Sequence, residues 1–274
     1  MTLHALLGLL DARLLGELRQ LFWPARCAGC DDYISDPLLF CPDCAPSITP
    51  LADVCPGCAL PLAPPEPPMP GRGEGRPCER QPSRCRPCSR APFAFAEAGV
   101  ACEYGAALAD AIVAMKHRGR RDLAPRLARL MVEPLARVLE RGDFRREDAI
   151  VPVPLHPRKL RQRGFNQTLE LGRAALRQLR RQAGPKMAAR LPALERTLLL
   201  RTRDTRELGH LGPIARLQEV AGAFAVADPA RVRDRRMLLI DDVFTTGATL
   251  NECARVLRAA GAREVRVVAL ARAV

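Results

Sequence analysis

The sequence predicts an α/β protein in which a doubly wound, mostly parallel sheet follows a small cysteine-rich module. From residue 98 onward, short apolar runs alternate with segments of helical periodicity. Because a loop and a helix follow these runs, crossovers should join the strands in parallel. In addition, nine of the eleven cysteines lie between residues 27 and 88. We therefore expect an N-terminal amphipathic helix (1–24), a double zinc-binding module with a Pro/Gly-rich loop (25–92) and an α/β domain (93–274).

Leucines recur at helical spacing over residues 1–24, which predicts an amphipathic helix ended by Pro24. Two interpretations are open: the helix packs on the rest of the protein, or it docks to a membrane or a partner. Charged residues interrupt the segment, so it is a poor signal peptide. No run approaches the roughly 18 apolar residues of a membrane span. We expect a cytoplasmic protein without a membrane span.

Eight cysteines form four C-x2-C pairs, a spacing that aims two thiolates at one tetrahedral ion. Joining the first pair to the second and the third to the fourth gives two four-cysteine zinc sites. The second and third pairs have the same ten-residue separation as the first two, so they could pair instead. A disulfide framework is the weaker alternative in a reducing compartment. No histidine or carboxylate accompanies the pairs, which favours structural zinc. The predicted ligands are Cys27, Cys30, Cys41, Cys44, Cys55, Cys58, Cys85 and Cys88.

The other three cysteines have different settings. Cys78 lies in a Pro/Gly/Arg-rich stretch that should be a loop or linker, and it is either a free thiol or an alternative ligand. Cys102 and Cys253 lie in apolar contexts and are expected in the core.

In the first part of the α/β domain, the sequence predicts a strand followed by a helix that ends at Lys116–Gly119. A second helix is predicted over Leu123–Leu139. Lys116 is either an ordinary basic residue in a last helical turn or an anion ligand. A buried strand is expected at Ile150–Val153. A short loop with four cations follows it, ahead of a helix from about Asn166 to Leu179.

This basic loop, ahead of a helix N-terminus, suits pyrophosphate. His156 in the same loop is expected to be structural, with phosphate contact or proton transfer as the alternative. The candidate pyrophosphate ligands are Arg158, Lys159, Arg161, Arg163 and Lys116.

A later basic segment contains Arg201, Arg203, Thr205 and Arg206, and glycines follow it. We expect a flexible loop there. Three interpretations are open: the loop closes over a bound polyphosphate, it is a plain surface loop, or it contacts nucleic acid.

Residues 237–249, MLLIDDVFTTGAT, carry the most specific signal. An apolar strand leads to Asp241 and Asp242 at its end, then to a loop and a helix over Leu250–Ala260. Carboxylates accept hydrogen bonds from a ribose diol, and a loop at a helix N-terminus binds phosphate. A last strand is expected at Glu264–Ala271. The phosphate ligands predicted here are Thr245, Thr246, Gly247, Ala248 and Thr249.

The charge of the chain is distributed unevenly. Its formal net charge is +13, with 9 basic and 10 acidic residues in 1–90 and 34 basic and 20 acidic residues in 91–274. The excess of +14 in the second part would attract a polyanion such as a sugar polyphosphate or nucleic acid. Aromatic residues make up only 4% of the chain, which leaves few stacking platforms for single strands.

From LFWPARCAGC to its end, the chain resembles the ComF family of competence-associated, phosphoribosyltransferase-like proteins. The matching pieces are the paired cysteines, the K-x-x-G element at Lys116–Gly119, VPVPLHPRKLRQRGFNQT, R-x-R-x-T ending in GAF, and MLLIDDVFTTGAT. Leu208 and Glu219 stand where the family usually has glutamine and asparagine.

The resemblance implies a type I phosphoribosyltransferase fold, 5-phosphoribosyl 1-pyrophosphate (PRPP) as ligand, and Mg²⁺ bridging its oxygens. Asp241 and Asp242 would hold the ribose hydroxyls. It also implies a link to uptake of single-stranded DNA during transformation, with DNA-uptake proteins as partners.

Two functions follow from these observations. The chain is either a phosphoribosyltransferase, which positions PRPP and stabilises the departing pyrophosphate, or a nucleotide-sensing or single-stranded-DNA-binding accessory protein without turnover. No acceptor pocket is visible in the sequence.

Overall fold

The computed structural model describes residues 25–34, 38–62, 84–205 and 212–274. The expected N-terminal helix, Cys78, Arg206 and Leu208 lie outside these ranges. Within them, no helix is both long and apolar enough to cross a bilayer.

A five-stranded parallel sheet with the order β1-β7-β6-β2-β3 forms the centre of the molecule. A separate antiparallel hairpin joins β4 to β5. This confirms the predicted α/β class. The strands are β1 (Ala98–Glu103), β2 (Ala149–Pro152), β3 (Ala193–Leu194), β4 (Leu199–Arg201), β5 (Phe224–Val226), β6 (Arg236–Phe244) and β7 (Glu264–Arg272).

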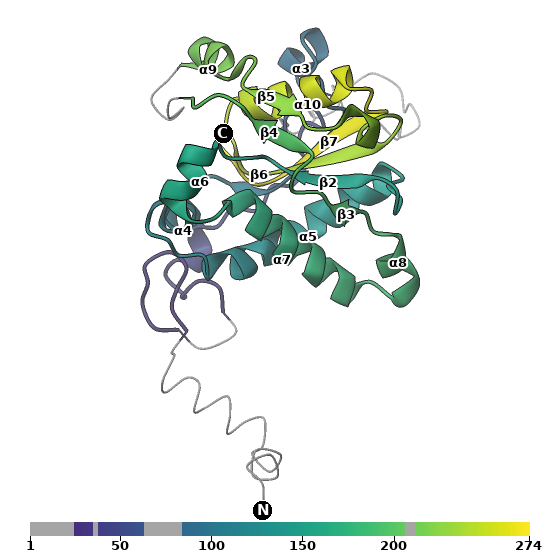
Figure 1. Cartoon of the computed structure of the whole chain (residues 1–274). Helices are drawn as coiled ribbons and strands as arrows, with labels where there is room; N and C mark the ends of the chain where they lie inside the picture. Colours follow the sequence, from purple (N-terminus) through teal and green to yellow (C-terminus); the bar gives the residue numbers. More distant parts are fainter. Residues whose placement is uncertain (1–24, 35–37, 63–83, 206–211) are drawn as a thin grey trace, which may run out of the picture.

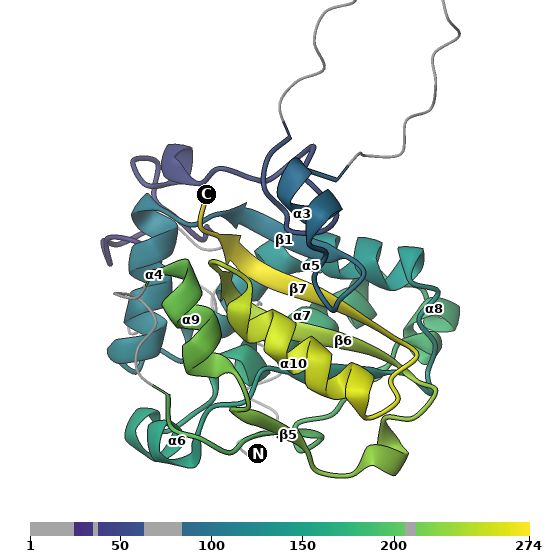
Figure 2. The same ribbon diagram turned by 90° about the horizontal axis from the view of Figure 1, so that it is seen from above.

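Helices cover both faces of this sheet, as Figures 1 and 2 show. The helices α4, α5 and α7 lie on one face, and α10 lies across the other with α9 and the β4–β5 hairpin beside it. The α-helices are α3 (Arg86–Arg90), α4 (Ala106–His117), α5 (Leu123–Arg141), α6 (Pro157–Arg163), α7 (Gln167–Gln182), α8 (Pro185–Arg190), α9 (Pro213–Val220) and α10 (Ala248–Ala259), and η1 (Ala45–Ser47) and η3 (Pro229–Arg231) are short 3-10 helices.

Each face of the sheet has its own apolar core, and each core includes cysteines of the N-terminal module. Cys27 and Cys41 belong to the core under α4, α5 and α7. Cys55, Cys58 and Cys88 belong to the core under α10. Cys102 and Cys253 are also buried, as predicted.

The module also protects one edge of the sheet. Its chain runs beside β1, where the Leu51 N–H donates to the Ala101 carbonyl at 3.0 Å and the Glu103 N–H donates to the Thr49 carbonyl at 2.8 Å. An uncovered edge strand is a site for pairing with another chain. The module therefore completes the sheet at β1, while β3 forms the opposite edge.

Two predicted boundaries are wrong. The basic segment 157–163 is the helix α6 rather than a loop, because Pro157 starts a turn that the His156 side chain caps and Gly164 ends at φ +80°. The strand β6 continues through the acidic pair to Phe244, because Asp241 and Val243 remain in register with β7. The other predicted strands and helices of this domain are present within a few residues.

Candidate functional site

The candidate site lies where the chain leaves β2 and β6, which are neighbours in the sheet. After β2 the chain passes through α6 and α7 to β3, and after β6 it passes through α10 to β7 on the other side. Adjacent strands whose connections diverge form a topological switch point, where open α/β sheets bind ligands at the carboxyl ends of the strands. Both predicted anion-binding segments therefore lie at the carboxyl ends of these two neighbouring strands, on either side of the same crevice.

The loop between β6 and α10 forms a small cradle. A cavity of about 20 Å³ is lined by Asp241 and by residues 243–250, which include all five predicted phosphate ligands. Gly247 has φ +80°, and a Cβ atom there would lie 2.7 Å from Phe244 and 2.9 Å from Phe93. Only glycine fits this turn. The cradle stands at the N-terminus of the twelve-residue helix α10, where backbone N–H groups and the helix dipole favour an anion.

The two carboxylates of the acidic pair, Asp241 and Asp242, have different surroundings. Successive side chains of a strand point to opposite faces of the sheet. Asp241 lines the cradle between β6 and α10. Asp242 is buried and forms an ion pair with Lys116 of α4, with 2.8 Å between Oδ1 and Nζ.

These surroundings change the pKa of Asp241 and leave one oxygen of Asp242 without a partner. Burial, followed by the charge of Asp242, raises the pKa of Asp241 to about 7, while Lys116 opposes the shift. The Asp242 Oδ2 atom is buried and has no hydrogen-bond partner among the described residues. A buried carboxylate oxygen without a donor is a position for a ligand hydroxyl or a cation.

A second cavity of about 230 Å³ joins the end of α4 to α6. Lys116, His117 and Gly119 line one side, and Lys159, Gln162 and Arg163 line the other. Three of the five predicted pyrophosphate ligands, Lys116, Lys159 and Arg163, therefore line the same cavity. Arg158 and Arg161 are exposed and do not line the cavity.

The β4–β5 hairpin connects to this basic cavity. Lys159 Nζ donates to the Thr205 carbonyl at 2.7 Å, and Thr205 is buried and accepts a hydrogen bond from Arg201. Arg158 pairs with Asp204 at 3.4 Å. Arg203 instead donates to the Glu219 carbonyl at 2.7 Å, at the end of α9. The structure therefore brings Arg201 and Thr205 to the site and directs Arg203 away from it.

His156 has a structural contact, as expected. Its Nδ1 accepts a hydrogen bond from the Arg158 N–H at 3.4 Å and lies 3.8 Å from Asp204. The half-buried ring caps α6 and connects it to the hairpin.

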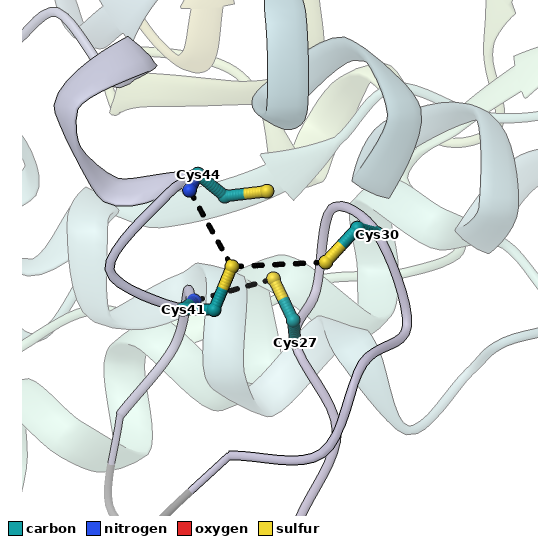
Figure 3. Close-up of side chains that lie close together, drawn as sticks. All are labelled: Cys27, Cys30, Cys41 and Cys44. Carbon is teal, nitrogen blue, oxygen red and sulfur yellow. Dashed lines mark hydrogen bonds between the residues drawn. The ribbon is translucent and has the colours of Figure 1, made fainter.

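Two clusters of four cysteines confirm the predicted grouping, and the alternative pairing of the second with the third cysteine pair is wrong. Within each cluster the four sulfur atoms lie within 4.8 Å of one another. Sγ atoms are 3.7 Å apart for Cys30 and Cys41 (Figure 3) and 3.6 Å apart for Cys58 and Cys85. Tetrahedral zinc with Zn–S bonds of about 2.3 Å separates its sulfurs by about 3.8 Å. The donor sets therefore fit zinc.

Backbone N–H groups stabilise a thiolate in each cluster. Burial opposes ionisation of Cys27, but amides including those of Cys41 and Gly29 lower its pKa to about 6. The same balance lowers the pKa of Cys55 to about 7. Thiolate is the form that binds a metal.

Arg272 connects the second cluster to the phosphate cradle. This buried side chain donates from Nε to the Cys58 carbonyl at 2.8 Å and from an Nη to the Phe244 carbonyl at 3.0 Å, and also bonds the Thr245 carbonyl. The guanidinium lies 4.6 Å from the Phe244 ring centroid. One arginine thus holds a metal-ligand turn and the start of the cradle together.

An aromatic cluster supports the same loop from the module side. Phe93 and Phe95 stack at 4.8 Å, and both meet the Phe244 ring edge-on at 6.0 Å. The Asn251 side chain of α10 accepts a hydrogen bond from the Ala94 N–H at 2.7 Å. The segment after the last cysteine pair therefore braces the loop.

Sequence reasoning missed Arg272, Phe93, Asn251 and Asp204. A single arginine near the end of an apolar strand was a usable signal for Arg272, because an isolated charge in such a run needs partners. The other three depend on contacts between segments far apart in the chain, which local patterns do not encode.

A parallel sheet with an acidic pair, a small cradle at a helix N-terminus and a basic cavity at its switch point defines a phosphoribosyltransferase-like α/β protein. Known sequences agree, because the family model described as the phosphoribosyl transferase domain matches residues 185–273. DNA utilization protein YhgH of Escherichia coli (strain K12) is 30% identical over 188 residues, which cover 69% of this chain and 77% of that protein.

Two further relatives carry competence names. Competence protein F of Haemophilus influenzae is 33% identical over 148 residues, covering 54% of this chain and 60% of that protein. Competence protein ComFC of Streptococcus pneumoniae is 32% identical over 130 residues, covering 46% of this chain and 49% of that protein. The chain belongs to the ComF family.

Proposed function

We propose that this protein binds PRPP together with Mg²⁺ at the switch point between β2 and β6. The observation that carries this proposal is the alignment of a phosphate cradle, a carboxylate and a basic cavity around neighbouring strand ends. PRPP presents a 5′-phosphate, a ribose diol and a pyrophosphate in that order. The three features match these three groups in chemistry.

Each part of the ligand has assigned residues. The loop Thr245–Thr249 takes the 5′-phosphate through backbone N–H groups and hydroxyls. Asp241, at the rim of the cradle, accepts hydrogen bonds from the ribose hydroxyls. Lys116, Lys159 and Arg163 neutralise the pyrophosphate, with Arg158 and Arg161 at the margin. Mg²⁺, a hard cation that prefers oxygen ligands, would neutralise part of the pyrophosphate charge when bound with PRPP.

This arrangement supports departure of pyrophosphate. When the bond from C1 to the pyrophosphate oxygen breaks, positive charge develops on the ribose and negative charge grows on the leaving group. Asp241 is placed to stabilise the positive charge on the ribose, and the cations of the basic cavity are placed to stabilise the negative charge on the leaving group. The acceptor nucleophile forms the new bond to C1 and loses a proton. Asp242 positions Lys116 through Oδ1, and its unpartnered Oδ2 can accept a hydrogen bond from a second ribose hydroxyl.

We propose that the biological role is handling of DNA, including single-stranded DNA entering during natural transformation. The names of the relatives, DNA utilization protein and competence protein, support this role. The excess positive charge of residues 91–274 supports it as well. A sensing role, in which PRPP is bound and not turned over, is the second candidate, because the sequence shows no recognisable acceptor pocket.

Isothermal titration of the zinc-loaded protein with PRPP and Mg²⁺ tests the ligand assignment. We expect saturable binding in the parent and at least tenfold weaker binding in Asp241→Asn. Asp110→Asn is the matched control, because Asp110 is an exposed carboxylate on α4 without an ion pair among the described residues. Absence of binding in the parent would refute the PRPP assignment. Release of pyrophosphate on adding candidate acceptors separates transfer from sensing.

A further inference from the structure

A groove of about 780 Å³ lies between α7 and the chain just after β3. We call it the arginine groove. The end of α7 and β3, which flank the groove, lie near α8 and on the other side of the molecule from α6 (Figure 1). Five of its ten lining residues are arginines, namely Arg173, Arg177, Arg180, Arg181 and Arg196.

The arginines form a regular stripe because α7 is amphipathic. Leu171, Ala175 and Leu179 face the core and are buried. Arg173, Arg177 and Arg181 follow at intervals of four on the exposed side. Four residues advance a helix by about 6 Å, so the three guanidinium groups are spread over about 12 Å of α7. The stripe therefore presents evenly repeated positive charges.

These charges are poorly compensated within the described part of the chain. Glu195 is the one acidic residue among the lining residues, and it pairs with Arg231 outside the lining at 2.5 Å. Arg173 has a partner in Glu170 at 3.3 Å. Over the described ranges, no carboxylate lies within ion-pair distance of Arg177, Arg181 or Arg196.

Such an arrangement costs stability in the free protein. Like charges four residues apart on a helix repel one another. The helix dipole compensates only the arginines of the last turn. An anionic ligand with repeated charges would relieve the repulsion.

We propose that the arginine groove binds the sugar–phosphate backbone of a nucleic acid strand. Guanidinium groups match phosphate oxygens with paired hydrogen bonds. The regular spacing along α7 suits a polymer with one charge per unit. No aromatic residue lines the groove, so bases do not stack there and binding does not depend on sequence. The groove lies apart from the phosphate cradle, so this inference does not rest on PRPP binding.

Fluorescence anisotropy with a labelled oligothymidylate tests the proposal on the full, zinc-loaded chain. The groove variant is Arg173→Gln/Arg177→Gln/Arg181→Gln. The control is Arg146→Gln/Arg233→Gln/Arg263→Gln, which removes three exposed arginines that have no carboxylate partner in the described ranges; in the groove variant, Arg173 has such a partner and Arg177 and Arg181 do not. Thermal unfolding of both verifies that they fold, and Arg177→Gln alone serves if the triple groove variant does not.

We expect the groove variant to bind at least tenfold more weakly at low salt. Its plot of log affinity against log salt should be shallower by about 2, since each phosphate contact to a single strand contributes about 0.7 to the slope. Arg177→Gln alone should lower the slope by about 0.7. The control and the addition of saturating PRPP should leave both quantities unchanged.

Three results would overturn the proposal. Equal losses in the groove and control variants would mean that net charge alone attracts DNA. Displacement of the oligonucleotide by PRPP would place the contact at the switch point. Displacement by poly-glutamate at equal charge concentration would identify the groove as a site for acidic polypeptides.

Discussion

Lys116 and Asp242 form an ion pair of 2.8 Å that connects the end of α4 to the middle of the sheet. The Asp242 side chain is 5% exposed and that of Lys116 is 21% exposed, so the pair is screened little by water. Lys116 also lines the basic cavity. The acidic strand thereby sets the position of a cation that faces the proposed pyrophosphate.

Lys116→Met should destabilise the protein by about 2–4 kcal/mol, because it leaves the buried Asp242 without its partner. Asp242→Asn in the Lys116→Met background should recover part of the loss. Urea denaturation of the four proteins in a double-mutant cycle measures the coupling, which we expect at about 1–3 kcal/mol. Additive effects of the two substitutions would show that the pair has no energetic coupling.

Asp241→Asn should make the protein more stable at neutral pH. The folded-state pKa of about 7 lies above the ordinary 3.8, so the folded protein binds more protons than the unfolded chain between these values. Parent stability therefore falls as pH rises through that window, and asparagine removes this loss. We expect the difference in unfolding free energy between variant and parent to grow by about 1–2 kcal/mol from pH 4 to pH 8. Asp110→Asn should show no such growth, and a constant difference for Asp241→Asn would contradict the raised pKa.

Much of the fold was predictable because its signals are local. Apolar runs and caps, such as Asn166 before α7, specify strands and helices within a few neighbouring residues. The acidic pair and the loop after it were recognisable for the same reason. The strand end was wrong because pairing with β7 keeps Asp241 and Asp242 in the sheet despite their polarity. Propensity alone does not contain that pairing.

The site was predicted less completely than the fold. Four cations crowded into residues 158–163 indicated an anion site, but only the turn geometry of α6 decides which of them face it. The salt bridge between Lys116 and Asp242 and the contact between Arg272 and Cys58 join elements more than a hundred residues apart. Such contacts follow from the assembled sheet.

Gly247→Ala should disable the cradle. The residue has φ +80° and two aromatic rings within 3 Å of the position of a Cβ atom. We expect a loss of about 2–4 kcal/mol in stability and no measurable PRPP binding. Gly184→Ala is the control, since its φ is −60° and nothing lies within 4 Å of its added Cβ. Wild-type titration heats in Gly247→Ala would show that the cradle tolerates a side chain.

Arg272→Met should weaken PRPP binding without removing zinc. The substitution deletes the donors to the Cys58 and Thr245 carbonyls and one of the two donors to the Phe244 carbonyl, and each buried acceptor left unpaired costs about 1–3 kcal/mol. Zinc content by colorimetric chelation should stay at the parent value, while titration should give a PRPP affinity at least tenfold lower. Arg263→Met, at an exposed position, should alter neither. Parent-like PRPP affinity in Arg272→Met would show that the cradle keeps its shape without this brace.

The cysteine clusters predict the metal content. Cys30→Ser and Cys58→Ser each remove one ligand from a different cluster. We expect two zinc ions per chain in the parent and one in each variant by elemental analysis. Cys102→Ser, outside both clusters, should retain two. A parent with no zinc after purification without chelators would contradict the metal assignment.

Because each cluster contributes cysteines to a different apolar core, metal binding and folding of the two layers are thermodynamically linked. A ligand that binds only the folded chain stabilises it by mass action, in proportion to the logarithm of its free concentration. The stability of the apolar core on each face of the sheet would then depend on the zinc supply of the cell, each core through its own ion. In a zinc-starved cell, the amount of folded protein would fall before any residue of the anion-binding crevice had changed.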